Sequence, residues 1–145
     1  MTSPPIDRTL GSLHPMFRNA LEAWLTEARA RVEHVDFRVT ETRRTLERQA
    51  WLYAQSREAP YLRSPPVTWT LDSRHRFGLA ADLAMIRKDT KRAIWEVSSW
   101  RWLYRTIPVE PYGLRHLDPI ELVHLEWRYA DEAIAEAPVV DLVQT

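Results

Sequence analysis

The chain has 145 residues, of which 45% are hydrophobic and 28% are charged. This is the size of one ordinary domain with a buried core, so we expect residues 1–145 to form a single domain with loose ends at 1–14 and 138–145. Twenty Lys and Arg residues balance twenty Asp and Glu residues, so no net charge favours binding to nucleic acid or to an anionic membrane. The absence of cysteine excludes disulfides, a thiol nucleophile and zinc sites built from thiolates.

Hydrophobic periodicity predicts two helices and a strand in the first part of the chain. Apolar residues at three- and four-residue spacing predict a helix over about 16–32. Alternating apolar and polar residues over 35–39 are typical of a half-buried strand. A second helix is predicted over 45–55, where a threonine can cap the first turn.

Shorter elements are predicted in the rest of the chain. In chain order these are an irregular loop over 56–66, strands over 67–70 and 79–86, a helix over 98–106, turns over 108–119, a last strand over 122–127 and a helix over 129–137. Helices therefore come first and strands later. This order predicts an α+β fold, in which helices pack on a small antiparallel or mixed sheet.

Two short segments concentrate side chains that can bind a metal ion. The first runs from 73 to 82 and contains His75 and Asp82, and the second runs from 121 to 127 and contains His124. Strand alternation places Asp82 on a face with small residues, and it places His124 opposite the apolar side chains of its own strand. If the two strands are neighbours, Asp82 and His124 can face each other, with His75 entering from the turn that Gly78 permits.

Two imidazoles and one carboxylate form a ligand set that suits Zn²⁺, and three protein ligands leave a fourth position for water. Such a site is catalytic when a nearby carboxylate can accept a proton from the water. Glu121 is our candidate for that base, although a flat strand would turn it away from His124. We expect the strand to bend, because Pro119 favours an irregular entry into it. Glu126 is the alternative base or a partner of His124, and Asp118 is a weaker third candidate.

These segments resemble a known family. The stretch from Ser73 to Asp82 matches all five fixed positions of the pattern Ser-x-His-x-x-Gly-x-Ala-x-Asp found in zinc D-Ala-D-Ala peptidases and L-alanyl-D-glutamate endopeptidases, which cut bacterial cell-wall peptides. The stretch from Glu121 to His124 is similar to the family's acid-x-x-His element. An arginine-bearing region over 40–57 resembles the upstream part of the family, so the likeness spans about residues 35–127.

The resemblance implies a role for each matching residue. It implies that zinc is held by His75, Asp82 and His124, and that Glu121 is the catalytic base. It also implies that a guanidinium stabilises the oxyanion or anchors a substrate carbonyl, a role suited to a group that is always charged.

Arg44 is the residue implied for this guanidinium, with Arg43 as the adjacent alternative. Arg43 and Arg48 can equally form a solvated helix face. Ser73 and Gln49 are implied to bind substrate or to orient the metal ligands.

The expected function is zinc-dependent hydrolysis of a peptide bond in the peptidoglycan stem peptide. An L-alanyl-D-glutamate endopeptidase of the endolysin type is favoured because the chain is compact and residues 53–57 are similar to that subfamily. The alternatives are a D-Ala-D-Ala carboxypeptidase or dipeptidase, a non-catalytic module that binds wall peptides and, more remotely, a nucleic-acid module using the arginines of 38–57.

The expected setting follows from the same sequence. Zinc is the only cofactor that we expect, and the stem peptide is the expected partner. We expect neither binding to nucleic acid nor insertion into a membrane. We also expect the chain to be a monomer. No apolar run is long enough for a signal peptide or a membrane span. We therefore expect synthesis in the cytoplasm and action on the cell wall or periplasm after release, as for a phage or prophage lysin.

Overall fold

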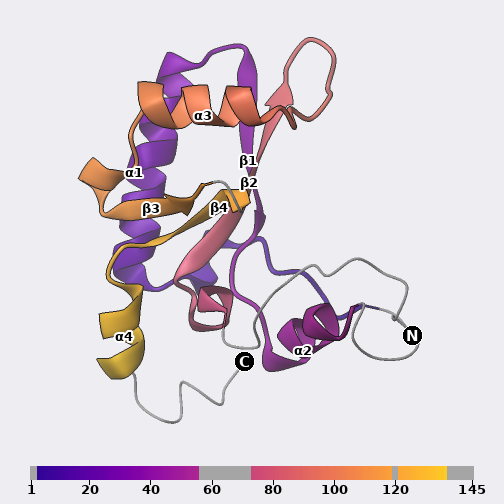
Figure 1. Cartoon of the computed structure of the whole chain (residues 1–145), viewed down its shortest axis with the longest axis vertical. Helices are drawn as coiled ribbons and strands as arrows, with labels where there is room; N and C mark the ends of the chain where they lie inside the picture. Colours follow the sequence, from indigo (N-terminus) through magenta and orange to yellow (C-terminus); the bar gives the residue numbers. More distant parts are fainter. Residues whose placement is uncertain (1–2, 56–72, 119–120, 137–145) are drawn as a thin grey trace.

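The computed structural model describes residues 3–55, 73–118 and 121–136 (Figure 1). Its regular elements are, in chain order, α1 (Pro15–Arg31), β1 (Val35–Glu41), α2 (Leu46–Ala54), β2 (Ala80–Arg87), α3 (Val97–Thr106), β3 (Leu114–Leu117), β4 (Glu121–Trp127) and α4 (Ala130–Glu136). Short 3-10 helices cover Leu10–Ser12 (η1), Arg74–Phe77 (η2) and Glu110–Tyr112 (η3). These elements confirm the predicted α+β fold. The loop predicted over 56–66 and the strand predicted over 67–70 lie outside the described residues.

The four strands form one antiparallel sheet in the order β1-β2-β4-β3. The prediction of turns alone over 108–119 is wrong, because Leu114–Leu117 forms the edge strand β3. Prolines and a glycine surround this strand and predict turns. The strand has four residues, of which one is buried, so it shows almost none of the apolar and polar alternation that predicts a strand. The central pairing joins β2 to β4 and sets Asp82 directly opposite His124.

Helices α1 and α3 cover one face of the sheet. The α1 side chains Phe17, Leu21, Trp24, Leu25 and Ala28 share a core with Ala81, Leu83 and Met85 of β2. Trp24 also packs against Tyr104 of α3, with ring centroids 6.1 Å apart. Because strand side chains alternate, residues that neighbour this core set in sequence, such as Asp82, project from the opposite face.

Residues 3–14, which we expected to be loose, contact the rest of the domain. Leu13 is only 3% exposed and belongs to the core. The amide of Thr42 donates a hydrogen bond to the carbonyl of Asp7 (2.7 Å), and Arg48 donates one to the carbonyl of Pro4 (3.3 Å). This segment therefore lies against the start of α2 and the end of β1.

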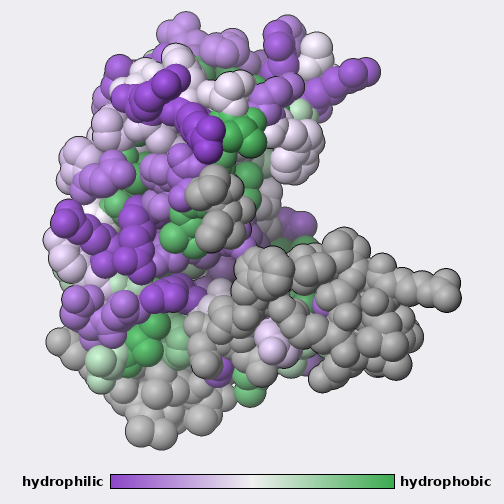
Figure 2. All heavy atoms as spheres, viewed as in Figure 1, coloured by the Kyte–Doolittle hydropathy of each residue, from purple (hydrophilic) through white to green (hydrophobic). Residues whose placement is uncertain are grey.

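The described residues on the face shown in Figure 2 are mainly hydrophilic. In the view of Figure 2, hydrophobic residues form small patches separated by hydrophilic ones over the described part of the chain. No helix among the described residues has both the length and the apolar character needed to cross a membrane.

Gly78 shapes the turn between η2 and β2. Its φ angle is +69°, and a Cβ atom at this position would lie 2.9 Å from the carbonyl oxygen of Ser12 and 3.1 Å from the amide of His14. We predict that Gly78→Ala lowers the free energy of unfolding by about 1–3 kcal/mol, because it adds left-handed strain and a backbone clash. Urea denaturation measures the change. Gly11→Ala is the matched control, since its Cβ would meet nothing within 4 Å, and equal stability of the two variants would contradict the prediction.

Candidate metal centre

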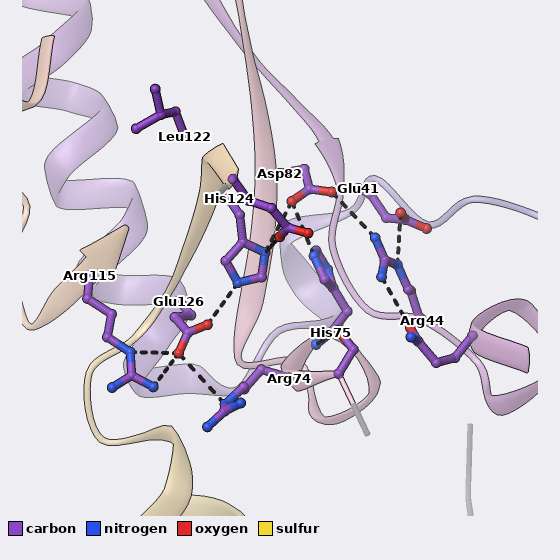
Figure 3. Close-up of polar contacts among 12 residues, drawn as sticks. Glu41, Arg44, Arg74, His75, Asp82, Arg115, Leu122, His124 and Glu126 are labelled. Carbon is purple, nitrogen blue, oxygen red and sulfur yellow. Dashed lines mark hydrogen bonds and ion pairs between the residues drawn. The ribbon is translucent and has the colours of Figure 1, made fainter. Parts of the chain in front are cut away.

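Three side chains from separate segments converge on the face of the sheet opposite α1 (Figure 3). Asp82 comes from β2, His124 from the facing position of β4, and His75 from η2. Nε2 of His75 lies 3.2 Å from Oδ1 of Asp82, and Nδ1 of His124 lies 3.4 Å from the same oxygen. One ligand atom from each residue lies within 4.8 Å of the others.

The donor set and its spacing fit a zinc ion. Two ligand atoms at 2.0–2.1 Å from a tetrahedral ion are separated by roughly 3.3 Å. The separations of 3.2 and 3.4 Å from Oδ1 of Asp82 agree with this value. Two imidazoles and a carboxylate are also ligands that Zn²⁺ accepts. His75, Asp82 and His124 could therefore hold a metal ion, and they contribute three protein ligands to it.

The orientation of His75 is set by the backbone around it. Nδ1 of His75 lies 2.7 Å from the carbonyl oxygen of Thr42, and because a carbonyl only accepts, Nδ1 is the donor in this contact. Oγ of Ser73 accepts a hydrogen bond from the amide of His75 (3.2 Å), and the amide of Arg44 donates to the carbonyl of His75 (2.8 Å). Nε2 is therefore the ring nitrogen that points to Asp82, 3.2 Å from its Oδ1, and it is the atom of His75 placed to bind a metal ion.

His124 is held in the same manner by a different group. Its Nε2 lies 2.9 Å from Oε1 of Glu126, while its Nδ1 faces Asp82. Glu126 is only 2% exposed and lies behind the His124 ring, on the side away from Asp82 (Figure 3). The sequence left two roles open for Glu126, that of the catalytic base and that of a partner of His124. This position favours the second role.

Glu121 lies next to the cluster in spite of the parity argument. Its Oε2 is 3.6 Å from Nδ1 of His124, and its side chain is 38% exposed. The pairing of β3 with β4 shifts register between His116 and Leu117, so that Leu117 pairs with Glu121 while His116 pairs with Leu125. This irregularity agrees with the expected bend, and the side chains of Glu121 and His124 lie close together in spite of their odd spacing.

Arg44 also reaches the cluster. Its Nη2 lies 3.5 Å from Oδ2 of Asp82, its Nε donates to Glu41 (3.0 Å) and its Nη1 donates to Oε1 of Gln49 (3.1 Å). Arg44 is 9% exposed and Gln49 is fully buried, so Gln49 is placed to orient the guanidinium. Arg48 pairs with the other oxygen of Glu41 and is buried, so the solvated-face interpretation is wrong for Arg48.

Asp118, the third candidate for the base, does not join the cluster. It is exposed and forms an ion pair with Arg101 of α3 at 3.0 Å. The hydrogen bonds from Arg101 lower the pKa of Asp118. Among the three carboxylates considered, only Glu121 is both close to the metal-facing nitrogen of His124 and partly open to solvent.

Electrostatic coupling within the cluster is strong. Burial would by itself raise the pKa of Asp82, but hydrogen bonds with His124 and His75 outweigh it and hold this pKa well below its usual range. Burial would likewise lower the pKa of His124, but hydrogen bonds to Asp82 and Glu126 raise it to about 9. In the metal-free protein at neutral pH, the His124 ring is therefore protonated on both nitrogens and lies between the carboxylates of Asp82 and Glu126.

This proton makes metal uptake depend on pH. Because Nδ1 of His124 must lose its hydrogen before it can bind zinc, zinc competes with a proton at every pH below about 9. We predict that zinc affinity falls as the pH is lowered from 9 towards 6.5, by up to tenfold per pH unit for this one proton. Titration calorimetry in buffers of different ionisation enthalpy should detect about one proton released from His124 per zinc at pH 7.5. An affinity that does not change over this range would contradict the prediction.

Some residues of the site could not be found by sequence reasoning. Thr42 acts through its backbone carbonyl, which no side-chain pattern reports. Arg115 of β3 binds Glu126 but lies in the stretch predicted as turns. Glu41 holds two arginines, and the signal that could have found it is a carboxylate at the end of the predicted strand, followed by the arginine-rich segment.

Comparison with known proteins finds solved structures with the same fold. No protein-family model matches the chain, and no curated protein matches its sequence. Solved structures do match, among them an L-Ala D-Glu endopeptidase, an LD-carboxypeptidase and a protein in complex with D-alanine-D-alanine. The chain shares the fold of these proteins.

Three solved structures illustrate the similarity. The L-Ala D-Glu endopeptidase ChiX of Serratia marcescens is 18% identical, with a TM-score of 0.61 over 85% of this chain and 86% of that one. VanYB in complex with D-alanine-D-alanine is 18% identical, with a TM-score of 0.56 over 92% and 82% of the two chains. The LD-carboxypeptidase LdcB is 15% identical, with a TM-score of 0.58 over 91% and 71%. A further match, a variant of the D,D-pentapeptidase VanY, was solved in complex with Zn(II).

Proposed function

We propose that the chain is a zinc-dependent peptidase that hydrolyses a peptide bond in the stem peptide of peptidoglycan. The observation that carries this proposal is the convergence of His75, Asp82 and His124, with Glu121 beside the metal-facing nitrogen of His124. The arrangement combines a three-ligand site for zinc with a carboxylate that solvent can reach. Neighbours with the same fold include an L-Ala D-Glu endopeptidase and an LD-carboxypeptidase that recognises peptidoglycan, which supports the substrate class.

Each residue of the cluster has a part in this proposal. His75 and His124 would hold the ion through Nε2 and Nδ1, and Asp82 through a carboxylate oxygen. A bound zinc ion supplies a Lewis acid that polarises a peptide carbonyl and lowers the pKa of water. Thr42 contacts Nδ1 of His75 and Glu126 contacts Nε2 of His124, so each imidazole has a partner for the nitrogen that would not bind the ion.

Glu121 and Arg44 act on the substrate in this proposal. Glu121 accepts the proton of the attacking water and passes it to the leaving amine, a role suited to a partly exposed carboxylate. Arg44 donates to the carbonyl oxygen as negative charge develops on it, and Glu41 and Gln49 hold its guanidinium in place. Ser73 caps η2 and orients His75, which supports an orienting role for Ser73 over direct contact with substrate.

The scissile bond that we propose is the one between L-alanine and D-glutamate. The similarity of residues 53–57 to that subfamily supports it, as does the match over most of both chains with the endopeptidase ChiX. We further propose that the chain acts as a monomeric single domain, in the manner of a lysin that meets the wall after release.

A second candidate is a carboxypeptidase that removes a terminal D-alanine. Two neighbours with the same fold favour it, one solved with D-alanine-D-alanine and one an LD-carboxypeptidase. Such an enzyme must recognise a free terminal carboxylate, so it would not cut a stem peptide whose C-terminus is amidated.

Digestion of defined stem peptides tests the proposal. Zinc-loaded protein is incubated with a pentapeptide stem and with its C-terminally amidated form, and the products are identified by mass spectrometry. The proposal expects cleavage after L-alanine in both peptides, whereas loss of D-alanine from the free acid alone indicates the carboxypeptidase. Peptide binding without any product would identify a non-catalytic module and would contradict the proposal.

A further inference from the structure

Glu126 is a buried carboxylate held between an imidazole and two guanidinium groups (Figure 3). Its Oε1 lies 2.9 Å from Nε2 of His124. Its Oε2 lies 2.6 Å from Nε of Arg115 and 3.7 Å from Nε of Arg74. The two oxygens of Glu126 therefore have separate partners, one facing the metal cluster and one facing the arginines.

The fold fixes both sides of this arrangement. Arg115 of β3 is paired in register with Glu126 of β4, so the two side chains lie across neighbouring strands. His124 is two residues before Glu126 on the same strand and projects from the same face. Arg74 directly precedes His75 in η2, which connects the carboxylate to the segment that carries another predicted ligand.

We propose that Glu126, anchored by Arg115, is a positioning residue that keeps the hydrogen of His124 on Nε2 and thereby directs the lone pair of Nδ1 towards the metal. A carboxylate can only accept, so a hydrogen on Nε2 is the arrangement that satisfies it. Outer partners of this kind typically contribute about 10–100-fold to metal affinity. The inference rests on the proposed metal site, but it does not depend on which peptide bond is cut.

Glu126→Gln tests this role because Arg115 constrains how an amide can sit. Arg115 presents only donors, so it attracts the amide oxygen and turns the amide NH₂ towards His124. The NH₂ group then donates to Nε2, which moves the hydrogen of His124 to Nδ1, where zinc must bind. We expect zinc affinity to fall by about 10–100-fold.

The measurement is zinc affinity by competition with a chromophoric chelator, together with thermal unfolding of the metal-free protein. Glu27→Gln is the matched control, since it makes the same change in an exposed ion pair with Arg31 on α1, and it should bind zinc as the wild type does. Unchanged zinc affinity in Glu126→Gln would overturn the inference. A wild-type protein that binds no zinc would instead refute the proposed function itself.

A double variant separates positioning from a merely structural role. In Arg115→Met/Glu126→Gln the arginine no longer attracts the amide oxygen, so the oxygen can turn to accept from His124. We expect this variant to bind zinc more tightly than Glu126→Gln and more weakly than the wild type. If Glu126→Gln does not fold, the double variant still tests the inference, because affinity at the wild-type level would overturn it. Affinity of the double variant below that of a folded Glu126→Gln would also overturn it.

Discussion

Glu121→Gln is expected to leave zinc bound while it lowers the rate of stem-peptide hydrolysis by about 10²–10⁴-fold, the usual contribution of a general base. The amide cannot accept a proton, although it keeps nearly the same shape as the carboxylate. Glu121 is 38% exposed and is not one of the three clustered ligands, so its loss should leave the metal cluster in place.

The check on Glu121 combines zinc content with a turnover assay. Glu27→Gln serves as the matched control, because it changes a carboxylate on the opposite side of the sheet without touching the cluster. A Glu121→Gln variant that cuts stem peptides at the wild-type rate would remove Glu121 from the mechanism, and loss of zinc in this variant would make it a ligand instead of a base.

Asp82→Asn is expected to abolish both zinc binding and hydrolysis. Asp82 is the one anionic member of the cluster, and its carboxylate contacts both His75 and His124. A neutral amide is a weak zinc ligand, so we expect zinc affinity to fall by more than the roughly 100-fold that marks the upper end for outer partners. Wall digestion should fall with it.

Elemental analysis of the purified variant, followed by wall digestion, measures this effect. Asp89→Asn is the control, since Asp89 pairs with Arg87 at the exposed end of β2. Full zinc occupancy in Asp82→Asn would show that the ion is held by other residues. Loss of zinc in both variants would point to a general loss of folding, which circular dichroism would detect.

The long amphipathic helices and the central strands were predictable because their apolar residues recur with a clear period. Helix α1 was predicted over 16–32 and is found at Pro15–Arg31, and β2 was predicted over 79–86 and is found at Ala80–Arg87. Strand β3 was not predictable, because its four residues derive their structure from pairing with β4 and not from a pattern of their own. The prolines and the glycine around these residues predict turns, whereas nothing in the four residues themselves predicts the pairing with β4.

The cluster itself was foreseen from strand parity and motif spacing. Asp82 and His124 face each other across β2 and β4 in the register that the sequence suggested. The position of Glu121 requires a bend for which Pro119 is the sequence signal, and the pairing of β3 with β4 shifts register between His116 and Leu117. Bulges of this kind depend on the partner strand, so they escape an argument made from one strand alone.

The supporting layer around the cluster was largely hidden from the sequence. A backbone carbonyl, that of Thr42, orients His75, and the arginine that anchors Glu126 comes from an unpredicted strand. These contacts join residues that lie 33 and 11 positions apart in the chain, and only the folded sheet brings them together.

The proposed peptidase needs one zinc ion held by three side chains that are distant in sequence. A crystal structure of zinc-loaded protein, with data collected on both sides of the zinc absorption edge, would locate this ion. We predict one anomalous peak about 2.0–2.2 Å from Nε2 of His75, Nδ1 of His124 and a carboxylate oxygen of Asp82. A protein that takes up no zinc, or a peak that lies away from these atoms, would show that His75, Asp82 and His124 are not the zinc ligands.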